Sequence, residues 1–249
     1  MRLSDEVLIF EKNAKVMGVN SLFPPGSVLN SIIPIQGLQI HEKAIVESCM
    51  AETIRARVST IELFCGEYAS NPILLRSPSG STIIAGRLHD KDIHARRIIL
   101  TDFRIFSNRW SDRSAERVQP RYPVYFDLHF HDTVVRGNLY DLSLNGAGIF
   151  VALSATVDPD SLVKSSANFS LRIKPFLDFC KVKGVVENVR RISKNLVMLG
   201  FRVLPPQKWS MALEKYINLR KQEILAGIKS NLDKAINQPE VIQQYFLPA

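Results

Sequence analysis

The sequence has few cysteines and no long apolar runs, and both absences limit what the protein can be. Cys49, Cys65 and Cys180 are odd in number and widely spaced, with no Cys-x-x-Cys pair. A disulfide framework is therefore not expected, and each cysteine is predicted to be a small core residue. The first residues do not open a signal peptide, and no run of about 18 apolar residues indicates a membrane span. We expect a cytoplasmic protein without a membrane span.

Residue sets that would carry catalysis are also missing. We find no paired carboxylates, no Ser/His/Asp set and no Cys/His set at convincing positions, which argues against an enzyme. Asp127, His129 and His131 alternate as metal ligands on one face of a strand would. Such residues are more often the solvent-facing side of a half-buried strand. We therefore predict no metal and no cofactor.

Positive charge, in contrast, is in excess. Lys and Arg number 32 against 24 Asp and Glu, which gives a formal net charge of +8. A basic protein favours an anionic partner, and a nucleotide, a nucleic acid and an acidic protein all fit that description. The sequence has no helix-turn-helix or zinc-finger pattern, so nucleic acid is the less favoured partner.

The first informative motif is the arginine pair of R-x-x-x-R, Arg117 and Arg121. Pro120 lies inside the motif and Pro123 follows it, so a continuous helix is disfavoured and the pair is predicted on a loop. Two guanidinium groups on an extended loop suit phosphate oxygens and the O6/N7 edge of guanine, and they can stack on a base. Alone, the motif is more typical of a solvated basic loop.

The second motif is D-x-S-x-x-G, at residues 141–146. Its last two residues, Asn145 and Gly146, predict a hairpin turn of type I′, in which both have positive φ. Without further support, the motif would be an ordinary hairpin with polar residues facing water.

Alternation along the strand before this turn sorts the side chains by face. Asp141 and Ser143 are expected on one face, and Leu142 and Leu144 on the other. Gly148 follows the turn, and its missing side chain leaves room for a close approach to the strand. A carboxylate accepts hydrogen bonds from the N1–H and N2–H₂ groups of guanine, so Asp141 complements the arginine pair.

Together, the two motifs resemble the PilZ family, whose members bind the bacterial second messenger cyclic di-GMP. The similarity runs over roughly residues 113–225. Its matching positions are Arg117, Arg121, Asp141, Ser143, Gly146, a strand at 184–189 and a segment at 199–204 that leads into a helix. The resemblance implies a small antiparallel β-barrel with an arginine loop that closes over a ligand on its outer surface.

The resemblance also implies roles for the matching residues. Arg117 and Arg121 would clamp guanine and phosphate, Asp141 and Ser143 would line the opposing wall, and Gly146 would shape the turn. Many two-domain relatives place another arginine directly before the first motif arginine, where it helps to hold a stacked pair of ligands. Here that residue is Glu116, so we expect one cyclic di-GMP per site.

Turn and linker signals divide the chain into two parts. Polar residues at 107–114 predict a linker between an N-terminal mostly-β domain, 1–108, and a PilZ domain with a C-terminal helix, 109–249. The fold class is expected to be mostly β, with two β-barrel-type domains.

Within these domains, several elements can be predicted. Strands are predicted at 60–64, 73–75, 97–100 and from Tyr125, and a helix at about 40–56. A second helix is predicted after Pro205-Pro206 to about residue 236. Because this helix is longer than a small barrel can cover, the part beyond about Gly227 would pack on the N-terminal domain or on a second subunit.

These observations favour a cytoplasmic cyclic di-GMP receptor of the two-domain, flagellar-brake-like type. Ligand binding at the interdomain arginine loop would change the arrangement of the domains and regulate a protein partner, such as the flagellar motor or another effector, with a motility or biofilm output. A homodimer is left open. The alternative is a cyclic di-GMP-controlled DNA-binding transcriptional regulator. A PilZ scaffold that has lost its ligand is disfavoured by the intact motifs.

Overall fold

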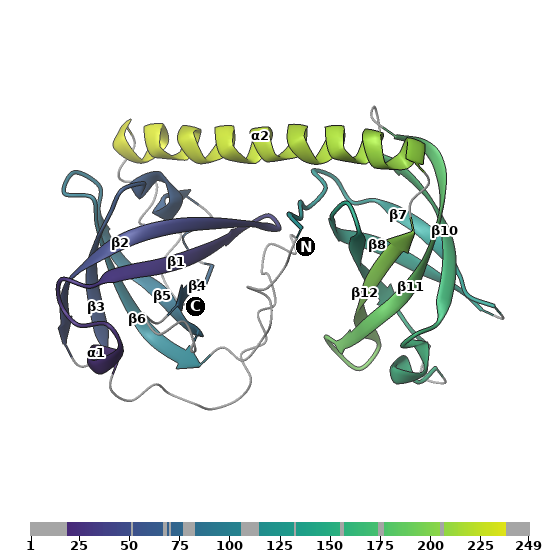
Figure 1. Cartoon of the computed structure of the whole chain (residues 1–249), viewed down its shortest axis with the longest axis horizontal. Helices are drawn as coiled ribbons and strands as arrows, with labels where there is room; N and C mark the ends of the chain where they lie inside the picture. Colours follow the sequence, from purple (N-terminus) through teal and green to yellow (C-terminus); the bar gives the residue numbers. More distant parts are fainter. Residues whose placement is uncertain are drawn as a thin grey trace. The chain divides into compact units, whose positions relative to one another are not determined.

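The computed structural model describes residues 19–50, 52–66, 69, 71–76, 83–105, 115–131, 133–154, 157–173, 177–204 and 207–237. The chain forms two compact units, residues 1–113 together with 224–249, and residues 114–223. Each unit contains a closed antiparallel barrel of six strands (Figure 1). The mostly-β class with two barrels is therefore confirmed. The predicted linker at 107–114 lies outside the described residues.

The first barrel has the strand order β1-β2-β3-β6-β5-β4. Its strands are β1 (Val28–Ile35), β2 (Leu38–Met50), β3 (Thr53–Val58), β4 (Ile73–Arg76), β5 (Ile83–Asp92) and β6 (Arg97–Ile105), and a short helix α1 (Val19–Leu22) precedes them. The strands predicted at 73–75 and 97–100 are confirmed, because they lie in β4 and β6.

The helix predicted at 40–56 is wrong, because these residues form the hairpin of β2 and β3. Burial follows the two-residue period of a strand, with Ala44 and Val46 buried on β2 and Ile54 and Ala56 on β3. Met50, which fitted the helical spacing, is exposed at the hairpin end. The apolar residues approximated a helical period only because they were read across two strands.

The strand predicted at 60–64 is also wrong, because Ile61–Phe64 form a 3₁₀ helix, η1. The amide groups before η1 do not enter a strand ladder: the N–H groups of Ser59 and Thr60 donate to Glu42 Oε1 at 2.7 and 2.9 Å. The tight turn then buries Ile61, Leu63 and Phe64 together, which an alternating strand would not do.

The second barrel has the strand order β10-β11-β12-β9-β8-β7. Its strands are β7 (Tyr125–His129), β8 (Val134–Leu142), β9 (Gly146–Ala152), β10 (Ser166–Ile173), β11 (Leu177–Arg191) and β12 (Leu196–Leu204). Inward residues alternate with outward ones along β7, β10 and β12. Inside, Phe169 stacks on Phe126 at 4.8 Å and meets Phe201 edge-to-face at 5.4 Å.

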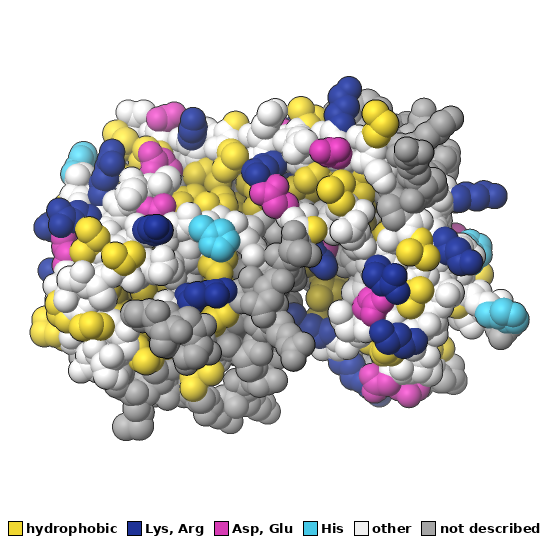
Figure 2. Space-filling view, viewed as in Figure 1, with side chains coloured by type: hydrophobic (Ala, Val, Ile, Leu, Met, Phe, Trp, Pro, Cys, Tyr) yellow, Lys and Arg dark blue, Asp and Glu magenta, His cyan; other side chains and the backbone are white. Residues whose placement is uncertain are grey.

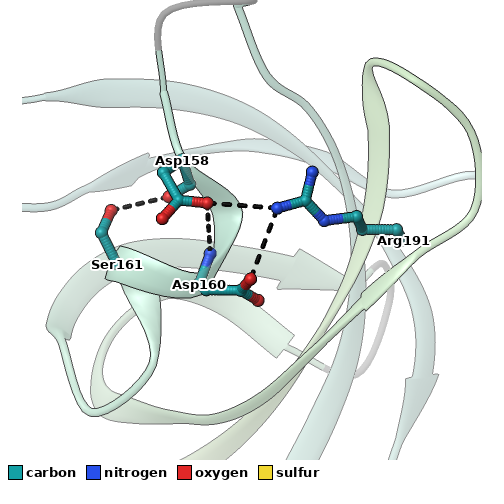
Figure 3. A network of polar contacts seen from close by, with 4 residues as sticks. All are labelled: Asp158, Asp160, Ser161 and Arg191. Atoms are coloured by element: carbon teal, nitrogen blue, oxygen red, sulfur yellow. Dashed lines mark hydrogen bonds and ion pairs between the residues drawn. The ribbon is translucent and has the colours of Figure 1, made fainter.

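A short 3₁₀ helix, η4 (Pro159–Leu162), lies between β9 and β10. Asp158 caps it by accepting a hydrogen bond from the Asp160 N–H at 3.2 Å. Arg191, at the end of β11, reaches both carboxylates, with Nη2 at 3.1 Å from Asp158 and 3.4 Å from Asp160 (Figure 3). Because all three side chains are exposed, this network orients the connection and adds little stability.

The predicted C-terminal helix is confirmed as α2 (Gln207–Asn237). The compact unit of the second barrel extends to Glu223, and the helix from Ile224 onward belongs to that of the first barrel. Gly66 explains how this later part packs. A Cβ at Gly66 would lie 2.6 Å from the side chain of Asn231. Of the two surfaces expected for the helix beyond about Gly227, the N-terminal domain and a second subunit, the first is the one that it contacts.

The cysteines of the first barrel are free thiols, Cys65 buried and Cys49 half-buried. Burial raises the pKa of both thiols, which keeps them protonated at neutral pH and unreactive. The side chain of Cys180 lies outside the described residues. Among the described residues, no helix is both long and apolar enough to span a membrane.

The turn between β8 and β9 differs from the sequence expectation. Ser143 donates to the Gly146 carbonyl through its N–H at 2.8 Å and its hydroxyl at 3.1 Å, and the Val203 N–H donates to the Asn145 carbonyl at 3.0 Å. Neither Asn145 nor Gly146 has positive φ, so the type I′ turn is wrong. Glycine is needed at Gly146 for another reason: a Cβ there would lie 2.8 Å from the Phe201 carbonyl oxygen.

The expected alternation also stops at this turn. Leu142 is buried, but Leu144 is exposed, so the two leucines do not share a face. Asp141 and Ser143 are both buried. The period of two ends at Ser143 because the chain turns there and its N–H pairs within the turn.

This geometry predicts different outcomes for the two turn residues. Gly146→Ala should lower the free energy of unfolding by about 1–3 kcal/mol, because the new methyl group overpacks against β12. Asn145→Ala should stay within about 0.5 kcal/mol, because its φ is ordinary and its side chain is exposed. Urea unfolding midpoints measure both. Equal losses of stability in Gly146→Ala and Asn145→Ala would instead support the explanation by positive φ.

Candidate ligand site

The arginine loop, residues 117–121, is held beside the end of β8. The Val118 N–H donates to the Leu142 carbonyl at 2.9 Å, and the Leu142 N–H donates to the Val118 carbonyl at 3.0 Å. Among the described residues, this isolated bridge is the one β-type pairing that the loop makes. The prediction that the arginine pair lies on a loop is confirmed, and the bridge brings that loop to the D-x-S-x-x-G hairpin.

The first arginine meets the aspartate of the second motif. Arg117 Nη1 lies 3.0 Å from Asp141 Oδ1, and the Gly148 N–H donates to the same oxygen at 2.8 Å. The Asp141 side chain is 4% exposed, so its charge needs these partners. A Cβ at Gly148 would lie 2.8 Å from that oxygen, which explains why this position has no side chain.

Ser143 and Gly146 lie in the same corner, beside Arg117 and Asp141, but the two residues have different roles. The Ser143 hydroxyl is buried and bonded to the Gly146 carbonyl. The Gly146 Cβ position is 3.9 Å from Arg117 Nη2. In this structure, therefore, Arg117, Asp141, Ser143 and Gly146 are brought together, with the serine building the turn.

Arg121 is placed apart from this group. Its side chain is 63% exposed, its Nη1 lies 4.0 Å from Glu223 Oε1 of α2, and its guanidinium lies 5.5 Å from the centre of the Tyr122 ring. It borders a cleft of about 750 Å³, lined also by Tyr216, Arg220 and Glu223 of α2 and by residues of β7 and β10. Arg117 and Asp141 do not line this cleft, so the structure separates the two motif arginines.

A row of four residues extends the corner across the outer face of the barrel, and the sequence analysis missed two of them, Gly200 and Asn188. Asp141 on β8 pairs with Gly148 on β9, Gly148 with Gly200 on β12, and Gly200 with Asn188 on β11. A Cβ at Gly200 would collide with the Asn188 side chain. Two adjacent glycines flanked by a carboxylate and an amide form a flat, polar floor. A glycine inside a strand, as at Gly200, was the available signal.

The neighbouring outward row carries larger groups. Tyr140 and Phe150 meet edge-to-face at 4.9 Å. Met198 on β12 separates Phe150 from Arg190 on β11. Burial lowers the pKa of Arg190, although an arginine remains charged at neutral pH. An anion placed near this guanidinium would offset the cost of burying its charge.

The histidine pair shows no sign of a metal site. Asp127, His129 and His131 are exposed, as expected for the solvent side of β7 and its end. Among the described residues, no group of three or more His, Cys, Asp or Glu side chains could hold a metal ion.

A family comparison agrees with the anatomy of the second barrel. The PilZ domain family model matches residues 111–218. Among solved structures, the chain is similar to the MrkH–c-di-GMP complex of K. pneumonia, with 15% identity over 80% of this chain and 90% of that one and a TM-score of 0.44. It is also similar to Escherichia coli YcgR in complex with c-di-GMP, with 15% identity over 85% and 91% and a TM-score of 0.41.

A third similar structure is the inhibitor of motility MotI/DgrA of Bacillus subtilis, with 11% identity over 80% of this chain and 98% of that one and a TM-score of 0.37. No curated protein matches the sequence. The family match spans both motifs and every strand of the second barrel. The chain therefore contains a PilZ domain, at residues 111–218.

Proposed function

We propose that the protein is a receptor for cyclic di-GMP, the ligand named for the MrkH and YcgR structures. The observation that carries the proposal is the contact between Arg117 and Asp141, which joins the two motifs inside a PilZ domain. The protein acts as a binder and not as an enzyme, with no cofactor besides the ligand. A cytoplasmic location stays a prediction from its few cysteines.

The chemistry of the site suits this ligand. Arg117 and Arg121 supply planar donors for phosphate oxygens and the O6/N7 edge of guanine, and the Asp141 carboxylate accepts from the opposite edge. One Arg–guanine contact contributes about 1–3 kcal/mol, and a stacked base adds about 1–3 kcal/mol. Two such contacts sum to about 2–6 kcal/mol, so the phosphate contacts would have to supply the rest of the roughly 8 kcal/mol that micromolar binding needs.

The floor beside the motifs supports the same ligand. The Asp141 carboxylate lies across Gly148 and the Asn188 amide lies across Gly200, so the floor presents polar groups, and Asn188 offers both a donor and an acceptor at its edge. Ser143, buried in its turn, supports the floor and keeps Gly146 in place. This assigns Ser143 a supporting role besides the direct contact that the family resemblance implies.

A protein partner with a motility or biofilm output is the favoured target of regulation. The alternative, a DNA-binding regulator, is supported by the net charge of +8. On the face seen in Figure 2, however, the described Lys and Arg side chains are interspersed with Asp and Glu. Strong DNA binding requires many phosphate contacts from a clustered basic surface, and the described residues on this face form no such cluster.

The ligand assignment is tested at Arg121. Arg121→Ala should weaken cyclic di-GMP binding at least about tenfold, which corresponds to about 1.4 kcal/mol. Arg121 is the better test than Arg117, whose removal would leave the buried Asp141 charge without its cation. Calorimetric titration measures the affinity, with GTP and cyclic di-AMP as ligand controls. Arg104→Ala, which removes the same charge from the first barrel, should bind normally, and unchanged binding by Arg121→Ala would contradict the proposal.

Ligand stoichiometry is tested at Glu116. Glu116 pairs with Lys221 of α2 and places a negative charge where the family resemblance leads one to expect an arginine. We expect one cyclic di-GMP per protomer, because a second, stacked ligand would meet this carboxylate instead of a cation. The double variant Glu116→Arg, Lys221→Glu keeps an ion pair with the two charges exchanged. It should raise the number of ligands per protomer toward two. Two ligands per wild-type protomer would refute the argument.

The output is tested by the arrangement of the two barrels. The arginine loop follows directly on the segment that joins the barrels in sequence, so pinning the loop gives the ligand a differential affinity for one arrangement. We expect the distance between one label on each barrel to change at saturating cyclic di-GMP, with Arg121→Ala as the control that stays constant. Small-angle scattering gives an independent readout. An unchanged distance in the wild type would leave regulation to a surface formed by the loop and ligand themselves.

A further inference from the structure

Helix α2 fixes the backbone of the arginine loop from a position about 100 residues away in sequence. Arg220 Nε donates to the carbonyl of Gln119 at 3.0 Å, and the two residues are 101 positions apart. Gln119 is the central residue of the R-x-x-x-R motif. Arg220 is 9% exposed, so it is a buried guanidinium committed to this contact and to a carboxylate of its own helix.

That carboxylate also faces the second motif arginine. Glu223 accepts from Arg220 Nη1 through Oε2 at 2.9 Å, while its Oε1 lies 4.0 Å from Arg121 Nη1. Residues three and four apart share a face of a helix, which places Tyr216, Arg220 and Glu223 in line along the loop. Tyr216 is buried and makes a hydrogen bond with the Arg121 backbone.

The two contacts of Glu223 differ in strength. Its bond to Arg220 is short and charge-assisted, and Arg220 is buried. Its pair with Arg121 is long and exposed, the kind of ion pair that contributes little and is readily exchanged. A ligand phosphate offers Arg121 two oxygens in bidentate geometry, so it can replace the Glu223 carboxylate while Arg220 retains it.

We propose that α2 is a working part of the ligand site, in which Arg220 positions the arginine loop and Glu223 holds Arg121 until a phosphate of the ligand replaces it. The proposal rests on the cyclic di-GMP assignment and extends it to the helix. Glu223 is a built-in competitor of the ligand, and Arg220 is a positioning residue that acts through the Gln119 carbonyl. The two side chains therefore have opposite effects on affinity, although they are bonded to each other.

Substitutions at the two positions separate these roles. Glu223→Gln removes the competing charge and should tighten cyclic di-GMP binding about two- to fivefold. Arg220→Lys keeps the charge but loses the planar fork that reaches Gln119 and Glu223 together, and it should weaken binding about fivefold or more. Glu214→Gln makes the same chemical change on an exposed position of the helix and should bind like the wild type. If the helix had only a structural role, Glu223→Gln and Arg220→Lys would both weaken binding.

A readout without ligand keeps the two proposals distinguishable. Hydrogen exchange of a peptide covering residues 115–124 should be faster in unliganded Arg220→Lys than in the wild type, and unchanged in Glu214→Gln. If wild-type protein fails to bind cyclic di-GMP, the ligand assignment is wrong, and exchange still decides whether the helix positions the loop. Weaker or unchanged binding by Glu223→Gln overturns the competitor role. Unchanged exchange in Arg220→Lys overturns the positioning role.

Discussion

The buried carboxylate of Asp141 sets the geometry around which the site is built. A charge that is 4% exposed must find partners inside the protein, and it finds the Arg117 guanidinium and the Gly148 N–H on one oxygen. The first contact draws the arginine loop onto the hairpin, where the bridge between Val118 and Leu142 completes the attachment. The second contact, with the Gly148 N–H, requires a strand position without a side chain. The loop, the hairpin and the glycine floor are thus consequences of satisfying one buried charge.

The two motif arginines have different tasks because their surroundings differ. Arg117 is part of the folded structure, since without it the buried Asp141 carboxylate would lose its cationic partner. Arg121 is exposed, and its guanidinium contacts Glu223 through a long ion pair and lies near the Tyr122 ring, so it can move at little cost to the fold. A motif that reads as a symmetric pair in sequence is therefore asymmetric in the folded protein. Arg117 attaches the loop to the hairpin, and Arg121 remains available to a ligand.

The second barrel was expected from the family resemblance, and local alternation supported only some of its strands. Phe126 and Leu128 alternate with polar residues, and β7 follows that pattern because one face is buried and the other is wet. In β2, a buried Glu42 interrupts the apolar pattern, because its carboxylate serves the amides before η1. A side chain whose role is set by a segment 17 residues away gives no periodic signal. The first barrel was therefore recognised only in part.

Contacts between residues far apart in sequence also explain why the turn geometry and the role of the helix at the site were not predicted. Asn145-Gly146 favours positive φ in isolation, but the close approach of β12 gives Gly146 an ordinary φ and a steric reason to lack a side chain. The contact of Arg220 with Gln119 spans 101 residues, and nothing local to either residue marks it. The family resemblance covers the motifs, so it located Arg117, Arg121 and Asp141 but gave no role to the helix residues that touch the loop.

Both motif arginines already have a carboxylate partner, and this changes how ligand affinity should be understood. Arg117 keeps Asp141, because that carboxylate is buried and has no alternative cation nearby in the described site. Arg121 shares Glu223 with Arg220, so a ligand can take Arg121 without leaving Glu223 uncompensated. In the proposed site, Arg121 would therefore contribute to affinity only the difference between a phosphate and a carboxylate at one exposed guanidinium. The net charge of +8 would speed the approach of an anion, and the exchange at Arg121 would lengthen its stay.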